Sequence, residues 1–307
     1  MNPNLINWTL QNINLQLKWV TPPMDIRQAI SQIKALPPLP GTAMRILNLN
    51  NDPNADTAKL AEIIEMDPLL TAQIIRWSTS SLYGYRGKVT TVYDAITRVL
   101  GFNFVLDLAL GLSVLAPLKS PKEGPIGTYV FWIHALCSTR FMKHLFDRMP
   151  DKSPLNQQEV FLAGLMHNIG FPLLGHQFPD EFARLCALIQ ANPSLSIFNL
   201  ETFSFGVNHS ETGAWLMNAW SMPRSITNVI YHHHNPYYRG ENHHLNLLTF
   251  LSDCLLSKID IGDAKNQNCP DEVWEVLGLE ETGCQEILDK LNEDLDKISE
   301  MAEMLIS

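Results

Sequence analysis

Short amphipathic segments with clear start and stop signals recur along this sequence, and they constrain its fold more than any other feature. In DPLLTAQIIRW, Asp67 is placed to cap a helix and Pro68 to occupy its first position. Leu70, Ile74 and Trp77 then fall on one helical face. DTAKLAEIIEM and TVYDAITRVLG repeat this pattern. The sequence therefore predicts an all-α fold.

One segment divides the helical pattern into two halves. Residues 119–127, KSPKEGPIG, combine prolines, glycines and mixed charges, which is typical of a linker. The groove between the halves, near this linker, is the expected place for a pocket. After a helix in YVFWIHALCSTRFMKHLF, further helices are predicted over 157–168, 179–191, 209–220, 224–234, 244–258, 271–277 and 283–305.

The segment NINLQLKWV departs from the helical pattern. Its apolar residues Ile13, Leu15, Leu17 and Trp19 alternate with polar ones, which is the period of a β-strand. A single strand has little to pair with in a helical protein. The segment is interpreted either as a helix with a misleading pattern or as an arm that pairs with a second copy, so a homodimer stays open.

Composition excludes several classes of protein. The 307 residues are 46% hydrophobic and 18% charged, which allows a large core. A net charge of −10 argues against a nucleic-acid partner, because such binding relies on Lys and Arg. No apolar run is long enough to span a membrane, and the N-terminus does not resemble a secretory signal. Five cysteines without a CxxC pair fit reduced thiols, so a cytoplasmic protein is expected.

The histidines are distributed unevenly. All ten follow the linker, and several lie in predicted helices beside apolar residues. Helices from different parts of the chain could aim these imidazoles at one point. Imidazole together with carboxylate suits divalent iron, manganese or zinc. The second half is therefore the candidate for a metal site.

The order of these residues resembles the HD superfamily of helical metal-dependent phosphohydrolases. His134, the pair His167-Asn168, His209, His233 and Asp253 follow the order and rough spacing of its ligands. The first half is similar to the HDOD family, the HD-related output domains of bacterial signalling proteins. The shared pieces are LPPLP at 36–40, DP at 67–68, Tyr83-Gly84 and the turn at 95–101. The resemblance covers roughly residues 26–256.

This resemblance implies an all-α HD-like architecture of two packed helical subdomains. It also implies a regulatory output role in bacterial signal transduction, with a protein partner and room for a small ligand. We expect an N-terminal extension at 1–25, an N-terminal helical subdomain at 26–118, the linker at 119–127, an HD-like subdomain at 128–260 and C-terminal helices at 261–307.

Several of the matching residues also allow a purely structural interpretation. His134 could be a packed core residue, and His209 stands between Asn208 and Ser210, either of which could simply cap a helix. In the triple histidine, His233 matches the family and His232 is the alternative, because successive helical residues point about 100° apart. Asp253 lies on an apolar face, where a carboxylate needs a partner.

Asn168 decides between two functions. The family places an aspartate here, and a neutral amide supplies neither its charge nor a bridging carboxylate. Gly170 is not followed by the lysine of related phosphohydrolases, and HHHNPYYRGENHH lacks a GYP loop. We therefore expect a non-catalytic module with a degenerate site that binds at most one divalent metal. The alternative is a mononuclear phosphohydrolase acting on a nucleotide or phosphate ester, with ligands His134, His167, His209, His233 and Asp253.

Overall fold

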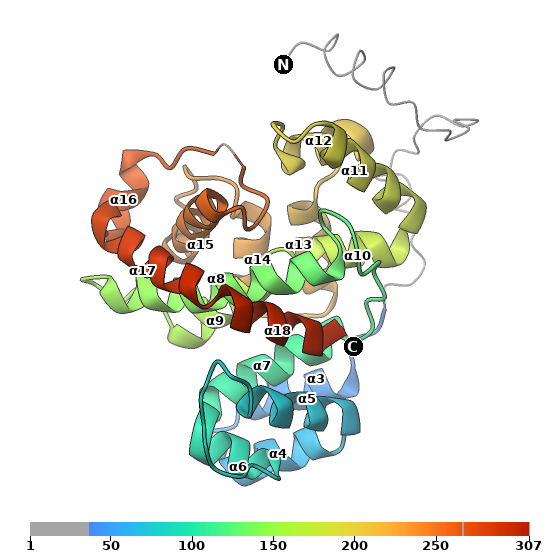
Figure 1. The fold of residues 1–307 in the computed structure, drawn as a ribbon, viewed down its shortest axis with the longest axis vertical. Helices are drawn as coiled ribbons and strands as arrows, with labels where there is room; N and C mark the ends of the chain where they lie inside the picture. The colour runs from blue at the N-terminus through green and yellow to red at the C-terminus, as the bar shows by residue number, and fades with distance from the viewer. Residues whose placement is uncertain (1–36, 266, 307) are drawn as a thin grey trace.

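The structure is a computed structural model, and it describes residues 37–265 and 267–306. Within these ranges the chain is all-α, with no β-strand (Figure 1). The fold class predicted from helical periodicity is therefore confirmed. The segment NINLQLKWV and the expected extension at 1–25 lie outside the described residues.

The first half forms a group of helices at one end of the molecule (Figure 1). Its elements are α3 (Gly41–Asn50), α4 (Thr57–Glu65), α5 (Pro68–Ser78), α6 (Val92–Ala95), the π-helix η1 (Ile96–Leu100) and α7 (Phe102–Leu115). The predicted start signals are present, since Asp67 accepts hydrogen bonds from the backbone N–H groups of Leu69 and Leu70. The Thr91 side chain likewise accepts from the N–H of Asp94.

The second half forms the larger group. Its elements are α8 (Thr128–Arg148), α9 (Gln157–Met166), α10 (Gly170–Gln177), α11 (Pro179–Ala191), α12 (Ile197–Phe205), α13 (His209–Ala219), α14 (Arg224–His232), α15 (His243–Leu256), the 3₁₀ turn η2 (Ser257–Ile259), α16 (Asp271–Leu277), α17 (Glu281–Glu293) and α18 (Leu295–Ile306). Helix α8 runs through its middle and packs against α9, α15, α17 and α18 (Figure 1).

Helix α7 joins the two groups through a continuous apolar core. Residues Val105 to Leu115 are all buried, because this nearly uniform apolar helix packs on α3 on one side and α9 on the other. At Gly111 an added Cβ would collide with the Leu165 side chain of α9. A small residue is thus needed where the two helices cross.

Some predicted helix boundaries were wrong. The helix expected over 283–305 is two helices, α17 and α18, separated at Asp294. Helix α14 ends at His232 instead of 234, and α10 and α12 were not among the predicted segments. In the described part of the chain no helix combines the length and the apolar character that crossing a membrane requires.

Candidate metal centre

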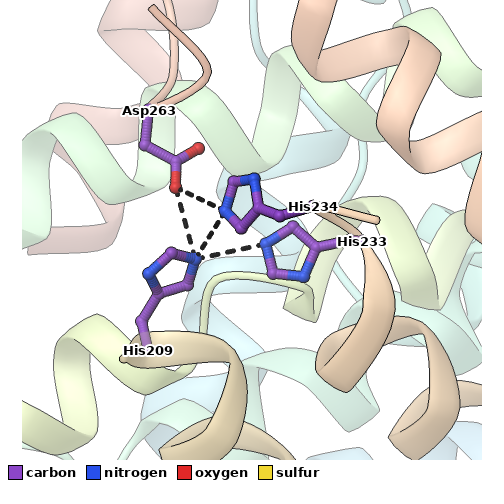
Figure 2. Close-up of side chains that lie close together, drawn as sticks. All are labelled: His209, His233, His234 and Asp263. Carbon is purple, nitrogen blue, oxygen red and sulfur yellow. Dashed lines mark hydrogen bonds and ion pairs between the residues drawn. The ribbon is translucent and has the colours of Figure 1, made fainter. Parts of the chain in front are cut away.

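Two groups of buried side chains converge in the second half. His134, His167 and Asp253 form the first group, and His209, His233, His234 and Asp263 form the second. In each group the ligand atoms lie within 4.8 Å of one another. We call the two groups together the His/Asp centre. Figure 2 shows that the second group draws its side chains from α13, the end of α14 and the loop after α15.

The residues of the first group come from three helices of the core. His134 lies in the middle of α8, and His167 is the C-cap directly after α9. Asp253 lies on α15, whose residues Leu245 to Leu256 are all buried. The Asp253 Oδ1 atom is 3.1 Å from His134 Nε2 and 3.4 Å from His167 Nε2. Burial raises the pKa of Asp253, but the two imidazoles outweigh it and the pKa lies below its usual range.

The second group is assembled around His209 Nε2. This atom lies 3.2 Å from His233 Nε2 and 3.0 Å from His234 Nε2 (Figure 2). Asp263 Oδ2 lies 3.1 Å from His234 Nε2 and 3.3 Å from His209 Nε2. Burial raises the pKa of Asp263, but the His234 imidazole next to it holds the pKa well below its usual range.

Asn168 connects the two groups. Its Nδ2 lies 3.0 Å from His134 Nδ1 and 3.5 Å from Asp263 Oδ1, so both N–H bonds face acceptors. The rings of His167 and His233 are 5.2 Å apart between centroids. The seven residues and Asn168 therefore form one continuous polar centre inside an apolar core.

The hydrogen bonds of the histidine Nδ1 atoms determine which Nε2 atoms can act as metal ligands. His233 Nδ1 donates to the Ile230 carbonyl at 2.8 Å, and His167 Nδ1 lies 3.1 Å from the Ala163 carbonyl. A carbonyl only accepts, so these Nδ1 atoms carry the protons. His209 Nδ1 is held by the buried Glu201 carboxylate at 2.6 Å. In the neutral state all three Nε2 atoms then present lone pairs to the interior.

The chain matches the model of a known protein family. A model described as the HDOD domain matches residues 36–236, which is more than half of the chain. The chain belongs to the HDOD family. His134, His167, Asn168, His209, His233 and His234 lie inside the matched range. Asp253 and Asp263 lie beyond its end, so the HDOD match does not cover the two buried carboxylates that complete the groups.

Solved and curated proteins show how far the HDOD likeness extends. A candidate signal transduction protein from Marinobacter aquaeolei VT8 is 31% identical with a TM-score of 0.82, over 99% of this chain and 66% of that one. A candidate metal-dependent phosphohydrolase from Shewanella amazonensis SB2B is 19% identical with a TM-score of 0.58, over 90% and 96% of the two chains, and shares the fold. A protein from Treponema pallidum (strain Nichols) is 24% identical over 225 residues, covering 73% of this chain and 42% of that protein. The chain thus spans less than half the length of this curated relative.

The donor set of this HDOD centre fits a cation. If the Nε2 atoms of His209 and His233 both carry lone pairs, no hydrogen bond can join them across 3.2 Å. A proton or a metal ion between them removes the repulsion. His167 Nε2 and Asp253 Oδ2 are also buried without a hydrogen-bond partner in the described residues. Imidazoles with carboxylates are the donors that zinc, iron and manganese accept.

The close packing of imidazoles and carboxylates also shifts the pKa values of the histidines. Burial lowers the pKa of His209, but the Glu201 carboxylate reverses this and the net direction is upward. For His167, Asp253 likewise overcomes burial and raises the pKa. Burial and the neighbouring imidazoles both lower the pKa of His233, well below its usual value. His233 is thus held neutral, which is the state in which an imidazole binds metal.

The structure brings every sequence-predicted ligand into this centre. His134, His167, His209, His233 and Asp253 all belong to it, and Asn168 lies between the two groups. Whether they bind metal stays a prediction. Both interpretations of the segment around His209 hold. Asn208 caps α13 together with Glu211, and the His209 side chain points into the centre. The alternative His232 stacks on Tyr238, with ring centroids 3.9 Å apart.

Sequence reasoning missed two members of the centre, His234 and Asp263. Because α14 ends at His232, His233 and His234 lie in a turn and can both face inward. Asp263 follows Gly262 in an irregular loop, where no periodic pattern marks a buried side chain. Gly262 itself was the available signal, because glycine often marks a backbone that approaches another group closely.

The loop bearing Asp263 closes the centre from outside. Gly262 has φ +95°, and a Cβ there would lie 2.8 Å from His134 Nε2. The cavity that remains beside His134, Asn168 and Asp263 measures about 20 Å³. Such a space holds about one water molecule. The space beside these three residues is therefore too small for a phosphate ester in this conformation.

Proposed function

We propose that this HDOD chain is a non-catalytic signal-transduction module whose His/Asp centre holds one divalent metal ion in a structural role. The observation that carries the proposal is the closure of the centre. Hydrolysis needs an open coordination position for water and space for the substrate, whereas structural sites are closed by protein ligands. The space of about 20 Å³ beside His134 and Asp263 supports the closed type.

The second group is the set that would hold the ion. His209, His233, His234 and Asp263 offer three imidazole nitrogens and one carboxylate oxygen, a four-donor set suited to zinc. When bound, the metal would supply positive charge that links α13, the end of α14 and the loop after α15. Glu201, hydrogen-bonded to His209 Nδ1, would orient that ligand.

Asp263 also compensates for the amide at position 168. Its Oδ1 lies 3.5 Å from Asn168 Nδ2, so the carboxylate stands beside the place where the family has one. An aspartate at 168 would put two carboxylates side by side in a buried site. The sequence predicted a degenerate centre from Asn168; the geometry supports one in which the carboxylate comes from a different element.

The signalling role rests on the HDOD family and on the Marinobacter protein, which is described as a candidate for signal transduction. An interaction partner is part of the proposal. Leu69 and Met66, on and beside α5, are 65% and 59% exposed although both are large apolar residues. Burial of such side chains by a partner is favourable, because it removes apolar surface from water. A second copy of the chain is one such partner.

The alternative is a mononuclear phosphohydrolase. The observation that favours it is that His167 Nε2 and Asp253 Oδ2 are buried without a hydrogen bond in the described residues, so both could serve as ligands in the first group. This activity would require the loop around Gly262 to move away from His134.

Metal analysis of the purified chain followed by hydrolysis assays separates the two functions. We expect about one zinc, iron or manganese per chain and no turnover of phosphate monoesters, nucleotides or cyclic dinucleotides with added manganese or iron. The His167→Ala variant serves as the background control. Metal-dependent turnover in the parent that disappears in this variant would overturn the non-catalytic proposal.

A further inference from the structure

A second polar site lies at the junction of the two helical groups, away from the His/Asp centre. A cavity of about 530 Å³ is enclosed by α5, α7, α8, α9 and α18. None of the residues of the His/Asp centre lines it, and neither does the linker at 119–127, where a pocket was expected. Its volume is in the range of sites for small organic ligands.

One part of the cavity is aromatic. Trp77, Tyr83, Phe104 and Phe161 line it, and Phe104 contacts the other three rings at centroid distances of 6.3, 5.9 and 5.1 Å, respectively. Trp77 Nε1 donates to the Tyr83 hydroxyl at 3.2 Å, which satisfies the polar atoms of both rings. Such a wall binds a flat ring by stacking and by burial of apolar surface.

A buried carboxylate belongs to this aromatic part. Asp107 follows Phe104 by one helical turn on α7, lines the cavity and is only 3% exposed. No hydrogen bond or ion pair to it occurs within 37–265 and 267–306, and burial raises the pKa of its carboxyl group to about 8. An unpartnered carboxyl in a core costs stability unless a ligand supplies its partner.

Basic side chains define the other part of the cavity. Burial and the nearby Arg140 guanidinium lower the pKa of the His144 imidazole, so Arg140 and Lys143 supply the positive charge. Arg140, Lys143 and His144 line it from α8, and Gln157 and Gln158 line it from the first turn of α9. Arg140 is paired with Asp294, and Lys143 meets only Asp147 across a half-exposed contact. Helix α9 begins here with its positive dipole end, although the Asn156 side chain already accepts from the Gln158 N–H. The combination favours an anionic group.

We propose that this cavity binds a purine nucleotide. The purine ring stacks against the wall formed by Trp77, Phe104 and Phe161. The N–H edge of the purine pairs with Asp107, and the phosphate lies near Lys143 and His144. A cationic amine fits less well because it would meet the charges of Arg140 and Lys143, and a purely apolar ligand would leave Asp107 without a partner. The site is independent of the proposed metal centre.

Titration calorimetry with GMP, AMP, guanosine and adenosine tests this site in the full chain. We expect saturable binding of at least one nucleotide, about tenfold tighter than its nucleoside. Lys143→Gln should remove that advantage, whereas Lys59→Gln, a similarly exposed and paired lysine on α4, should not. If neither nucleotide binds at millimolar concentration, or Lys143→Gln leaves the phosphate advantage intact, the proposal is wrong.

Asp107 variants identify the base and guard against a folding artefact. Asp107→Leu should weaken nucleotide binding about tenfold or more while the melting temperature stays the same or rises, because an unpaired carboxyl has been removed. Asp107→Asn should abolish binding if the ligand presents the two donors of guanine, and retain it if it presents the donor and acceptor of adenine. Unchanged affinity in Asp107→Leu would overturn the assignment.

Discussion

The His/Asp centre and the Asp107 cavity bury carboxylates in opposite ways. Asp253 and Asp263 face imidazoles at 3.1–3.4 Å, and the cavity beside Asp263 measures only about 20 Å³. Asp107 faces no charged partner in the described residues and borders a cavity of about 530 Å³. Closely packed imidazole and carboxylate groups leave room for a metal ion only. A large cavity with one unpaired carboxyl group can hold a small organic ligand. The two sites therefore serve different ligands in this account.

The largest expected effect is at Asp263. Asp263→Asn removes the carboxylate facing His209 and His234, and we expect unfolding free energy to fall by about 4 kcal/mol, together with loss of metal. Denaturant unfolding and metal analysis check this. Asp260→Asn, an exposed residue of the same loop at φ +60°, should change stability by less than about 0.5 kcal/mol. If both variants behave alike, Asp263 does not organise the centre.

Asn168→Asp tests whether the amide and Asp263 form a matched pair. The new carboxylate would stand about 3.5 Å from Asp263, and we expect a loss of about 3 kcal/mol in unfolding free energy. The double variant Asn168→Asp with Asp263→Asn should recover most of it. A double-mutant cycle of denaturant unfolding measures this coupling. Additive losses would show that the two positions are independent.

Asp107→Asn should act in the opposite direction and depend on pH. The folded parent keeps its proton up to a pKa of about 8, whereas the unfolded chain releases it near pH 4. The parent therefore loses stability as pH rises from about 4 to 8. We expect the variant to be nearly equal to the parent at pH 4 and more stable by about 2 kcal/mol already at pH 5.5, with the difference still growing toward pH 8. A difference that does not change with pH would show that Asp107 is not held protonated.

Gly262→Ala should give the smallest effect, and it probes closure of the His/Asp centre. Its Cβ would lie 2.8 Å from His134 Nε2 at φ +95°. Gly84→Ala is the control, because Gly84 has φ +58° and open space around its Cβ position. Denaturant unfolding should show about 1 kcal/mol more destabilisation at 262 than at 84. Equal losses would mean that the loop does not press on His134.

Local signals in the sequence predicted most of the helices, and the family resemblance predicted most of the centre. Asp67 with Pro68, and Thr91 with Asp94, predicted helix starts that the structure contains, because caps depend on neighbouring residues alone. The resemblance to the HD superfamily placed His134 and Asp253, which lie 119 residues apart in sequence, in one site. Their contact follows from the fold and from no local pattern.

What the sequence did not predict depends on tertiary contacts. His234 was not among the predicted ligands, because the choice within the triple histidine assumed a helical spacing that ceases to apply where α14 ends at His232. Asp263 becomes a neighbour of Asn168 only through the turn at Gly262. The Asp107 cavity is formed by helices from both halves and closed by α18, so no stretch of sequence reveals it.

The central claim is that the His/Asp centre holds a metal without performing hydrolysis. The most direct measurement is the metal content of the purified chain combined with hydrolysis of phosphate esters and cyclic dinucleotides by the same sample. The account predicts about one divalent ion per chain, lost in Asp263→Asn, and no turnover. Metal-dependent turnover that His167→Ala abolishes, or a parent chain that binds no divalent metal, would contradict it.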